Sequence, residues 1–376
     1  MAAGSSPPSS NNSRRSIDST FSARESAQQQ PGTDFGEYHL ERVRHRIEAD
    51  DKVLREARRR RDRVRALAEQ FVGALRSFPS GSVAHGTVRC PVKDADSGVV
   101  LDRRTWPQLG PDGSGLGPCQ IVRHMAEFIH RELVREWPAV TFEISKRAIV
   151  FTFHEPLGTE DPQEDPSVDL IVGLTRQDAP GLWIPNTRRD DWDASHPERH
   201  TELLTANPAE LRVFRARTIR LTKAIIGADG EYAVLSSFNI EALAHYTIRA
   251  ALPSQLDGLA AFLYASASGI AAGPTPDPAE VSPPIKLPDA ISQEQAVRRL
   301  SYFADCAADA VRDRYDEQAA LTALARLFPE QLPEAPQLSK DKLAAALATG
   351  SVGDVVTMSF RRPIKKTTPS FGDARR

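Results

Sequence analysis

The sequence predicts an α+β fold of two lobes, a mixed lobe over residues 35–195 and a helical lobe over residues 196–360. Between residues 99 and 174, short apolar runs rich in β-branched side chains have the length of strands. From residue 198 onward, apolar residues recur three and four positions apart, as on one face of a helix. The same helical spacing runs through residues 37–76, ahead of the strands.

The N-terminal elements follow from composition and periodicity. Residues 1–34 are rich in Ser, Asn, Gln, Pro and Gly and lack apolar periodicity, which predicts a disordered tail. From Glu37 to Arg76, an apolar stripe predicts one helix, ~60 Å long if unbroken at ~1.5 Å per residue. A helix of that length would run along both lobes.

The mixed lobe continues with strands and one helix, and the second lobe with helices. Strands are expected at Val99–Leu101, Thr141–Ile144, Ala148–Phe153 and Ser167–Leu174, with a helix at Pro118–Trp137. Later helices are expected at Ala209–Ile226, Phe238–Ala251, Leu256–Ala271, Ser292–Ala323 and Lys340–Ala348. Residues 273–288 are a Pro-rich connector, and residues 361–376 are expected to form a flexible C-terminal tail.

Composition excludes several classes of protein. The chain of 376 residues carries 48 Lys and Arg against 50 Asp and Glu, which argues against a protein that coats nucleic acid over its whole surface. No apolar run approaches the ~18 residues of a membrane span, and no apolar secretory segment opens the sequence. Three scattered cysteines suit neither a disulfide framework nor a zinc site. We therefore expect a cytoplasmic protein, and the preference for Arg over Lys with abundant Ala and Pro favours a bacterial source.

A dense group of arginines lies on the expected N-terminal helix: Arg55, Arg58, Arg59, Arg60, Arg61, Arg63 and Arg65. One interpretation is a face that binds nucleic acid or another anionic partner. The interpretation that we favour is a solvated helix face whose charges pair locally with Glu56 and Asp62.

The most informative segment joins a glycine turn to a pair of aspartates. Gly81 and Ser82 can offer backbone N–H groups and a hydroxyl to a phosphate, since glycine lets the chain approach closely. Asp94 and Asp96 stand two residues apart, so on a strand both side chains point to one face. Two adjacent carboxylates repel each other unless a cation lies between them, and Mg²⁺ combines carboxylates with substrate phosphates.

A third carboxylate is expected on a neighbouring strand. Asp169 stands alone in the apolar run Val168–Val172, where an unpaired charge would be costly, and metal ligation gives a reason for its presence. Alternatives stay open, because an Asp-x-Asp pair is also common in solvated turns and Asp169 would equally serve as a structural cap.

The combination of the Gly-Ser turn, the Asp94–Asp96 pair and the later Asp169 resembles the DNA polymerase β-type nucleotidyltransferase superfamily. Within it, residues 37–330 are most similar to the bacterial cyclic-oligonucleotide synthases related to cyclic GMP–AMP synthase and oligoadenylate synthetase. Further segments carry this resemblance: the strand Ser167–Val172, a loop with Trp183, Pro185, Trp192, Pro197 and His200, then Asn207, Arg220–Lys223 and Leu235–Glu241.

The resemblance implies a palm of the polymerase β type, with the first helix as a spine, a helical second lobe, and an active site in the cleft between the lobes. Asp94, Asp96 and Asp169 would hold two Mg²⁺ ions, which Mn²⁺ could replace. Asp169 would also help to deprotonate the attacking ribose hydroxyl.

The resemblance also implies a nucleotide site. Gly81 and Ser82 would hold the donor triphosphate, and Lys223 would neutralise its β- and γ-phosphates. Ser237 would donate a hydrogen bond to the same phosphates, and Phe238 would stack on a base.

The activity implied by the resemblance is the synthesis of cyclic di- or tri-nucleotide second messengers from nucleoside triphosphates, with release of pyrophosphate. It further implies anti-phage defence through a downstream effector that binds the product. Two alternatives remain: nucleotide addition to RNA 3′ ends, and a catalytically inactive homologue that binds nucleotide or RNA. We expect no nucleic-acid activator; if one binds, the Arg55–Arg65 face is its expected site.

The sequence departs from the family pattern directly after the aspartate pair, where Ser97 and Gly98 replace the usual apolar residue. One interpretation of Gly98 is a β-bulge that re-aims the strand, and another is a weakened, non-catalytic site. We further interpret His85 as a surface residue of the turn, and Trp183 and Trp192 as packing at the junction of the lobes.

Overall fold

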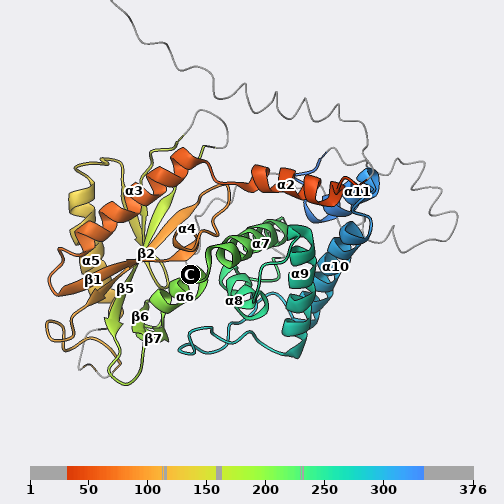
Figure 1. Ribbon diagram of the computed structural model, residues 1–376. Coiled ribbons are helices and arrows are strands. Elements are labelled where there is room, and N and C mark those ends of the chain that lie inside the picture. The colour runs from red at the N-terminus through yellow and green to blue at the C-terminus, as the bar shows by residue number, and fades with distance from the viewer. Residues whose placement is uncertain are drawn as a thin grey trace, which may run out of the picture. The chain divides into compact units, whose positions relative to one another are not determined.

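The computed structural model describes residues 32–333, apart from residues 112, 114–116, 158–162, 229 and 231–232. The expected helix at Lys340–Ala348, the expected tail at 361–376 and residues 1–31 lie outside the described residues. Strands occur up to residue 195 and helices predominate after it, as Figure 1 shows.

The elements divide into a mixed set and a helical set, which confirms the predicted α+β class. The mixed part contains helices α2 (Phe35–Ile47), α3 (Asp51–Ala68), α4 (Gly81–His85) and α5 (Pro118–Leu133). Its strands are β1 (Ala74–Pro79), β2 (Asp94–Leu101), β3 (Thr141–Ile144), β4 (Ile149–Thr152), β5 (Ser167–Thr175), β6 (Leu182–Asn186) and β7 (Asp191–Ser195). The helical part contains α6 (Pro197–Thr205), α7 (Ala209–Gly227), α8 (Ser237–Thr247), α9 (Gln255–Ala272), α10 (Gln293–Arg312) and α11 (Glu317–Leu327).

The strands form one mixed sheet in which β2 and β5, far apart in sequence, are neighbours. Within the described residues the sheet has seven strands in the order β1-β2-β5-β4-β3, with β6 beside β5 and β7 beside β6. The β2–β5 pair is parallel and the other pairs are antiparallel. The parallel pair brings the two aspartate-bearing strands into direct contact.

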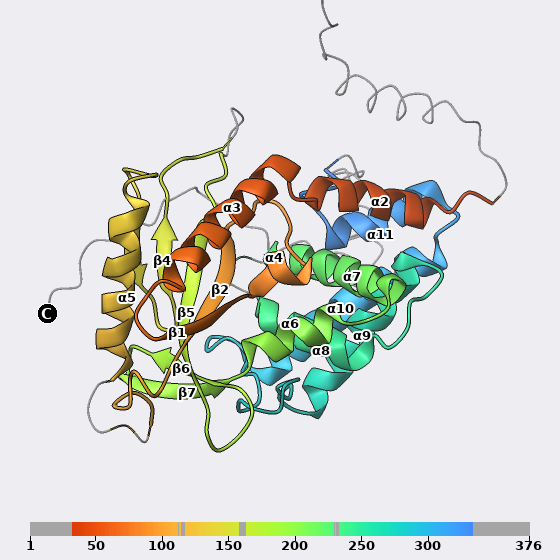
Figure 2. The same cartoon turned by 60° about the vertical axis from the view of Figure 1, so that its left-hand side comes forward.

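Helices α3 and α5 cover one face of this sheet (Figures 1 and 2). The core between them includes Val64 of α3, Ile121 of α5, Val99 of β2, and the even-numbered residues of β5 from Val168 to Leu174. Because side chains alternate along a strand, even-numbered residues of β2 and odd-numbered residues of β5 point to the opposite face. That opposite face carries the aspartates.

The expected single spine helix is wrong in one respect, because the segment forms two helices, α2 and α3. Glu48 is extended, and the carboxylate of Asp50 accepts hydrogen bonds from the N–H groups of Lys52 and Val53 at 2.7 and 3.2 Å. An N-cap aspartate starts a new helix without interrupting the apolar stripe, so periodicity alone does not separate the two. α3 ends at Ala68, and residues 74–76, the last of the expected helix, belong to β1 instead.

The two spine helices contribute to different cores. α2 places Leu40, Val43 and Ile47 in the core of the helices that follow residue 196, whereas α3 packs on the sheet. The N-terminal segment therefore spans both parts of the molecule, as its length predicted.

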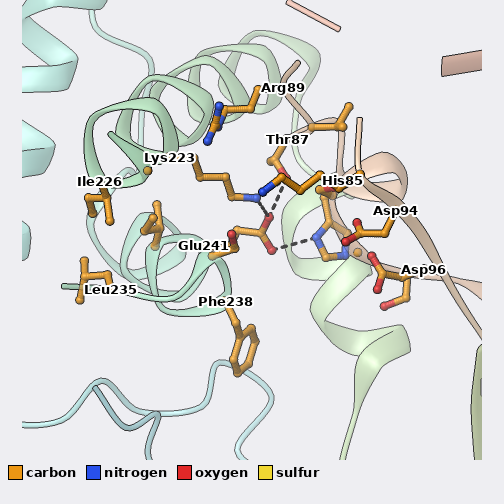
Figure 3. A pocket seen from close by; sticks show the side chains of 18 of the residues that line it. His85, Thr87, Arg89, Asp94, Asp96, Lys223, Ile226, Leu235, Phe238 and Glu241 are labelled. Carbon is orange, nitrogen blue, oxygen red and sulfur yellow. Dashed lines mark hydrogen bonds and ion pairs between the residues drawn. The ribbon is translucent and has the colours of Figure 1, made fainter. Parts of the chain in front are cut away.

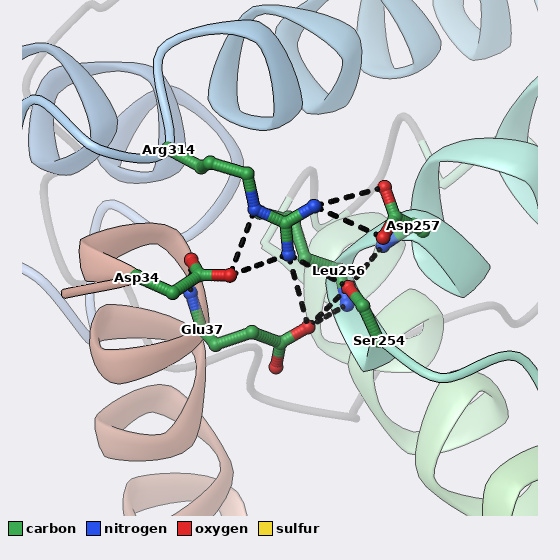
Figure 4. Close-up of polar contacts among 6 residues, drawn as sticks. All are labelled: Asp34, Glu37, Ser254, Leu256, Asp257 and Arg314. Atoms are coloured by element: carbon green, nitrogen blue, oxygen red, sulfur yellow. Dashed lines mark hydrogen bonds and ion pairs between the residues drawn. The ribbon is translucent and has the colours of Figure 1, made fainter. Parts of the chain in front are cut away.

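Arg314, between α10 and α11, fixes the start of α2 to the helical part (Figure 4). Its guanidinium donates hydrogen bonds to the carboxylates of Asp34 and Asp257 at 2.8 and 3.0 Å, and to the hydroxyl of Ser254 at 3.0 Å. Asp34 also caps α2 by accepting from the N–H of Glu37 at 2.9 Å, and Ser254 caps α9. Arg314 thus joins the first turns of α2 and α9 to the segment between α10 and α11.

The expected helix Ser292–Ala323 is also two helices, α10 and α11, because Asp316 caps a new one by accepting from the N–H of Ala319 at 2.9 Å. Strands β1, β6 and β7 and helices α4 and α6 have no counterpart among the expected elements. Among the described residues, no helix is both long enough and apolar enough to cross a membrane.

The arginines of α3 are largely engaged within the protein. Arg60 is fully buried and donates to Glu56, to Asp165 and to two backbone carbonyls. Arg61 is 8% exposed and pairs with Asp62 at 2.9 Å. The interpretation of a solvated face is therefore wrong for Arg60 and Arg61, whereas the local pairing with Glu56 and Asp62 is observed.

Candidate active site

Three aspartates meet on the sheet face that α3 and α5 leave open. The parallel register places Asp96 of β2 directly beside Asp169 of β5, and Asp94 stands two residues before Asp96 on the same face. All three side chains are half-buried. The structure therefore brings together the three carboxylates singled out in the sequence.

The surroundings of these carboxylates disfavour their charges. Burial, followed by the charges of Asp94, Asp169 and Glu241, raises the pKa of Asp96 to about 7. Burial, with Asp94 and Glu143 as further causes, raises the pKa of Asp169 to about 6. Burial also raises the pKa of Asp94, although Lys223 and Lys93 oppose it. Each aspartate thus lies in a partly desolvated position, and Asp96 and Asp169 also lie beside other negative charges.

The donor set fits a divalent cation such as Mg²⁺. Among the described residues, none of the three carboxylates takes part in a hydrogen bond or ion pair, so their oxygens remain available. Within the same part of the chain, no group of three His, Cys, Asp or Glu side chains is arranged so that it could hold a metal ion by itself. Mg²⁺ is commonly held by one or two carboxylates together with substrate phosphates, so a nucleotide would supply the remaining oxygens.

The glycine turn lies directly against Asp96. The N–H of Ser80 donates to the backbone carbonyl of Asp96 at 3.1 Å, and Gly81 begins the short helix α4 with a φ of 68°. A Cβ on Gly81 would lie 1.7 Å from the carboxylate oxygen of Asp96. Both the positive φ and this close approach require glycine. The turn that carries Ser82 therefore packs directly against Asp96.

Gly98 has a packing role, and its interpretation as a β-bulge is wrong. It pairs with Phe78 of β1 in a regular register, and the irregularity between these strands lies at Ala74 and Arg76. A Cβ on Gly98 would lie 2.2 Å from the ring of Phe78. The glycine thus lets the aromatic ring lie across the strand, and it leaves the direction of Asp96 undisturbed.

Lys223 of α7 lies in a buried network that the sequence did not predict (Figure 3). Its ammonium group donates to a carboxylate oxygen of Glu241 at 2.8 Å and to the hydroxyl of Thr87 at 3.2 Å. Thr87 donates to the same oxygen at 2.6 Å, and Nδ1 of His85 lies 3.0 Å from the other carboxylate oxygen. His85 is 7% exposed, so its interpretation as a surface residue is wrong.

The aspartate pair, the glycine turn and this network line one pocket of about 540 Å³. Ser237 and Phe238, at the start of α8, line it from the helical side, and Asp169 is the one predicted site residue that is not part of its lining. The ring of Phe238 is 37% exposed and lies 4.9 Å, between centroids, from the ring of His200. His200 is in turn held by Asp277 at 2.6 Å.

Sequence reasoning missed the wall formed by His85, Arg89, His200 and Glu241. His85 and Glu241 lie in segments that the sequence had singled out, but their pairing depends on the contact between α4 and α8. Arg89 carries no sequence signal, since it follows the turn in an irregular segment. His200 also lies in a segment that carried the family resemblance, but only the structure places it against Phe238.

The two tryptophans pack within the mixed lobe, so their expected place at the junction of the lobes is wrong. Trp192 is 6% exposed and belongs to the core between the sheet and α5. Trp183 packs against the same core, with the guanidinium of Arg176 over its ring at 4.7 Å. Both stabilise the β6–β7 hairpin.

Solved structures of bacterial nucleotide synthases share this fold. CdnC of E. coli MS115-1, solved with ATP, is 15% identical, with a TM-score of 0.54 over 79% of this chain and 98% of that chain. CdnG of Bradyrhizobium diazoefficiens, a CD-NTase solved with GTP, is 14% identical, with a TM-score of 0.53 over 79% and 99%. The c-di-GMP synthase CdnE from Capnocytophaga granulosa is 14% identical, with a TM-score of 0.54 over 79% and 92%.

No protein-family model matches the chain, and no curated protein matches it. The structural likeness covers most of this chain and nearly all of each compared chain, at low sequence identity. The chain therefore has the nucleotidyltransferase fold of the bacterial cyclic-oligonucleotide synthases, which confirms the predicted resemblance at the level of the fold.

Proposed function

We propose that the chain is a Mg²⁺-dependent nucleotidyltransferase that joins nucleoside triphosphates and closes them into cyclic di- or tri-nucleotides. The observation that carries this proposal is the set of unpaired, half-buried carboxylates of Asp94, Asp96 and Asp169 on neighbouring strands. Such carboxylates lower stability without a cation, and a pocket lined by the phosphate turn and Lys223 begins beside them.

Asp94, Asp96 and Asp169 would hold two Mg²⁺ ions, which Mn²⁺ could replace. When bound, the ions would supply positive charge at the attacking and leaving oxygens of an in-line displacement. The carboxylate of Asp169 would accept the proton of the attacking ribose hydroxyl. The ribose oxygen then bonds to the α-phosphorus, the bond to the β-phosphate oxygen breaks, and pyrophosphate leaves.

The other predicted residues would hold the nucleotide. Gly81 and Ser82 would contact the triphosphate with backbone N–H groups and a hydroxyl, and Ser237 would add a second hydroxyl from α8. Lys223 would stabilise charge on the β- and γ-phosphates. The exposed ring of Phe238 offers a stacking surface for a base, a contact that contributes ~1–3 kcal/mol.

The biological setting rests on the family resemblance alone. Under the proposal, a downstream effector binds the cyclic product, the synthesis takes place in the cytoplasm, and the pathway serves anti-phage defence. CdnC and CdnG were solved with ATP and GTP, which supports nucleoside triphosphates as the ligands of the pocket.

Product analysis tests the proposal. The purified protein is incubated with labelled nucleoside triphosphates, Mg²⁺ and a short RNA, and the products are then treated with phosphatase. The proposal predicts a small labelled species that resists phosphatase and is absent with Asp96→Asn. Label on the RNA would indicate 3′-end addition instead, and the lack of any product with folded protein would indicate an inactive homologue.

A further inference from the structure

The carboxylate of Glu241 occupies a central position in the pocket wall. Glu241 is 7% exposed, and its two oxygens accept hydrogen bonds from Lys223, Thr87 and His85 at 2.6 to 3.0 Å. Burial raises its pKa, but the opposing effects of Lys223 and His85 are larger and hold the pKa at about 2. The group is therefore an anion under all conditions in which the protein would act.

This carboxylate joins the two parts of the molecule. His85 ends α4 and Thr87 follows it in the mixed lobe, whereas Lys223 and Glu241 belong to α7 and α8 of the helical lobe. Nε2 of His85 lies 3.0 Å from the hydroxyl of Thr201 on α6. Figure 3 shows Asp94 and Asp96 on one side of the Lys223–Glu241 pair and Arg89 on the other.

The hydrogen bonds surround the carboxylate of Glu241 with donors. Nδ1 of His85 donates to it, because a carboxylate only accepts. Nε2 of His85 faces the hydroxyl of Thr201, which also lies 3.1 Å from the carbonyl oxygen of Pro197. His85 therefore links Glu241 to α6 and helps to fix the position of the carboxylate that binds Lys223.

Several carboxylates attract the ammonium group of Lys223. It acts electrostatically on both Asp94 and Asp96, and Lys93 acts on Asp94 as well, but neither aspartate forms an ion pair among the described residues. Two of its three N–H bonds are directed to Glu241 and Thr87, and the residues that the structure describes offer no acceptor for the third. Without Glu241, the attraction of the aspartates would draw the ammonium group toward the metal-binding carboxylates.

We propose that Glu241 is a positioning residue that holds Lys223 away from Asp94 and Asp96 and directs its third N–H toward the triphosphate. This inference rests on the proposed function, since it assigns a role within the nucleotide site. It explains why a lysine assigned to phosphate binding is paired with a buried carboxylate: the pair fixes the position of the lysine.

The test compares Glu241→Gln, Lys223→Met and the double variant with the wild type. Binding of non-hydrolysable α,β-methylene analogues of the nucleoside triphosphates is measured by calorimetry over a range of Mg²⁺ concentrations. We expect each single variant to bind the analogue about tenfold more weakly, and the double variant to bind no more weakly than Lys223→Met, because the two residues act as a unit.

The Mg²⁺ requirement separates positioning from a structural role. Glu241→Gln should need a higher Mg²⁺ concentration for half-maximal binding, because the released lysine competes for the aspartates. The double variant should return to the wild-type requirement, since the competing ammonium group is gone. Glu56→Gln is the matched control: it also loses ion pairs with arginines, away from the pocket, and should leave both measurements unchanged.

Folded Glu241→Gln protein with wild-type analogue affinity and Mg²⁺ requirement would overturn the inference. A double variant whose loss equals the product of the two single losses would also overturn it. If Glu241→Gln does not fold, Glu241→Asp replaces it, because the shorter side chain keeps the charge but cannot reach both Lys223 and His85. These two outcomes concern Glu241 alone and leave the proposed function untouched. The proposed function itself would be refuted if the wild-type protein bound no analogue.

Discussion

Asp94, Asp96 and Asp169 occupy neighbouring positions on β2 and β5, and the surroundings of each disfavour its charge. On the other side of the pocket, Glu241 is fully compensated by Lys223, Thr87 and His85. The aspartates thus lack partners, whereas Glu241 has a donor at each oxygen and Lys223 keeps one N–H without an acceptor among the described residues. The predictions at this scale test the two groups separately.

The aspartates are expected to act as one unit. Asp94→Asn, Asp96→Asn and Asp169→Asn should each reduce turnover by about 10³-fold or more, and the Asp94→Asn/Asp96→Asn pair should cost little more than either change alone. Steady-state synthesis rates, with circular dichroism as a check on folding, provide the measurement. A folded single variant that keeps near-normal turnover would remove that residue from the metal site.

The raised pKa of Asp96 predicts a pH dependence of stability in the metal-free protein. Its folded-state pKa of about 7 lies above the value of ~3.9 in an unfolded chain. Between these values the folded state binds more protons, so the stability contributed by protonated Asp96 is lost as pH rises from about 4 to about 7. Asp96→Asn should therefore melt higher than the wild type at pH 8, and the difference should vanish toward pH 4.

Thermal unfolding in the presence of a chelator measures this difference. Adding Mg²⁺ at pH 8 should raise the melting temperature of the wild type more than that of Asp96→Asn. Parallel pH profiles for the two metal-free proteins would show that Asp96 titrates normally in the folded state.

At the scale of elements, the sequence predicted β5 and most helices because their apolar runs are long and regular, but it predicted only the Val99–Leu101 end of β2. It could not predict breaks at Asp50 and Asp316, since a capping aspartate leaves the apolar spacing intact. Strands β1, β6 and β7 are only five or six residues long, and Pro185 within β6 disfavours a strand, so the sequence pattern did not indicate them. Asp94 and Asp169 were found because charges in or beside strands are conspicuous, whereas the His85–Glu241 contact depends on packing between distant helices.

Helix α3 offers a matched pair of arginines for a stability prediction. Arg60 is fully buried among two carboxylates and two carbonyls, and Arg58 is exposed. Arg60→Met should lower the free energy of unfolding by ~3–5 kcal/mol, because it leaves buried acceptors unpaired. Arg58→Met should change it by less than ~0.5 kcal/mol. Chemical denaturation of both variants checks this, and equal effects would contradict the burial described for Arg60.

At the scale of the whole molecule, the Arg55–Arg65 segment does not form a continuous phosphate-binding surface, because Arg60 and Arg61 are buried and paired within the protein. We predict that synthesis requires no added nucleic acid and that duplex DNA or RNA binds weakly near physiological salt. Turnover with and without duplex provides the measurement. Strong stimulation that is lost when Arg55, Arg58 and Arg59 are changed to Glu would instead indicate a nucleic-acid-gated enzyme.

The central claim is that one pocket both joins nucleotides and closes the ring, and the fate of the phosphates tests it most directly. Ring closure releases pyrophosphate for every nucleotide incorporated, whereas a linear product keeps one triphosphate. The wild-type protein is therefore incubated with nucleoside triphosphates labelled at either the α- or the γ-phosphate. We predict a product that carries the α label, lacks the γ label and resists phosphatase. A product that keeps the γ label, or no product from protein that binds nucleotide, would contradict it.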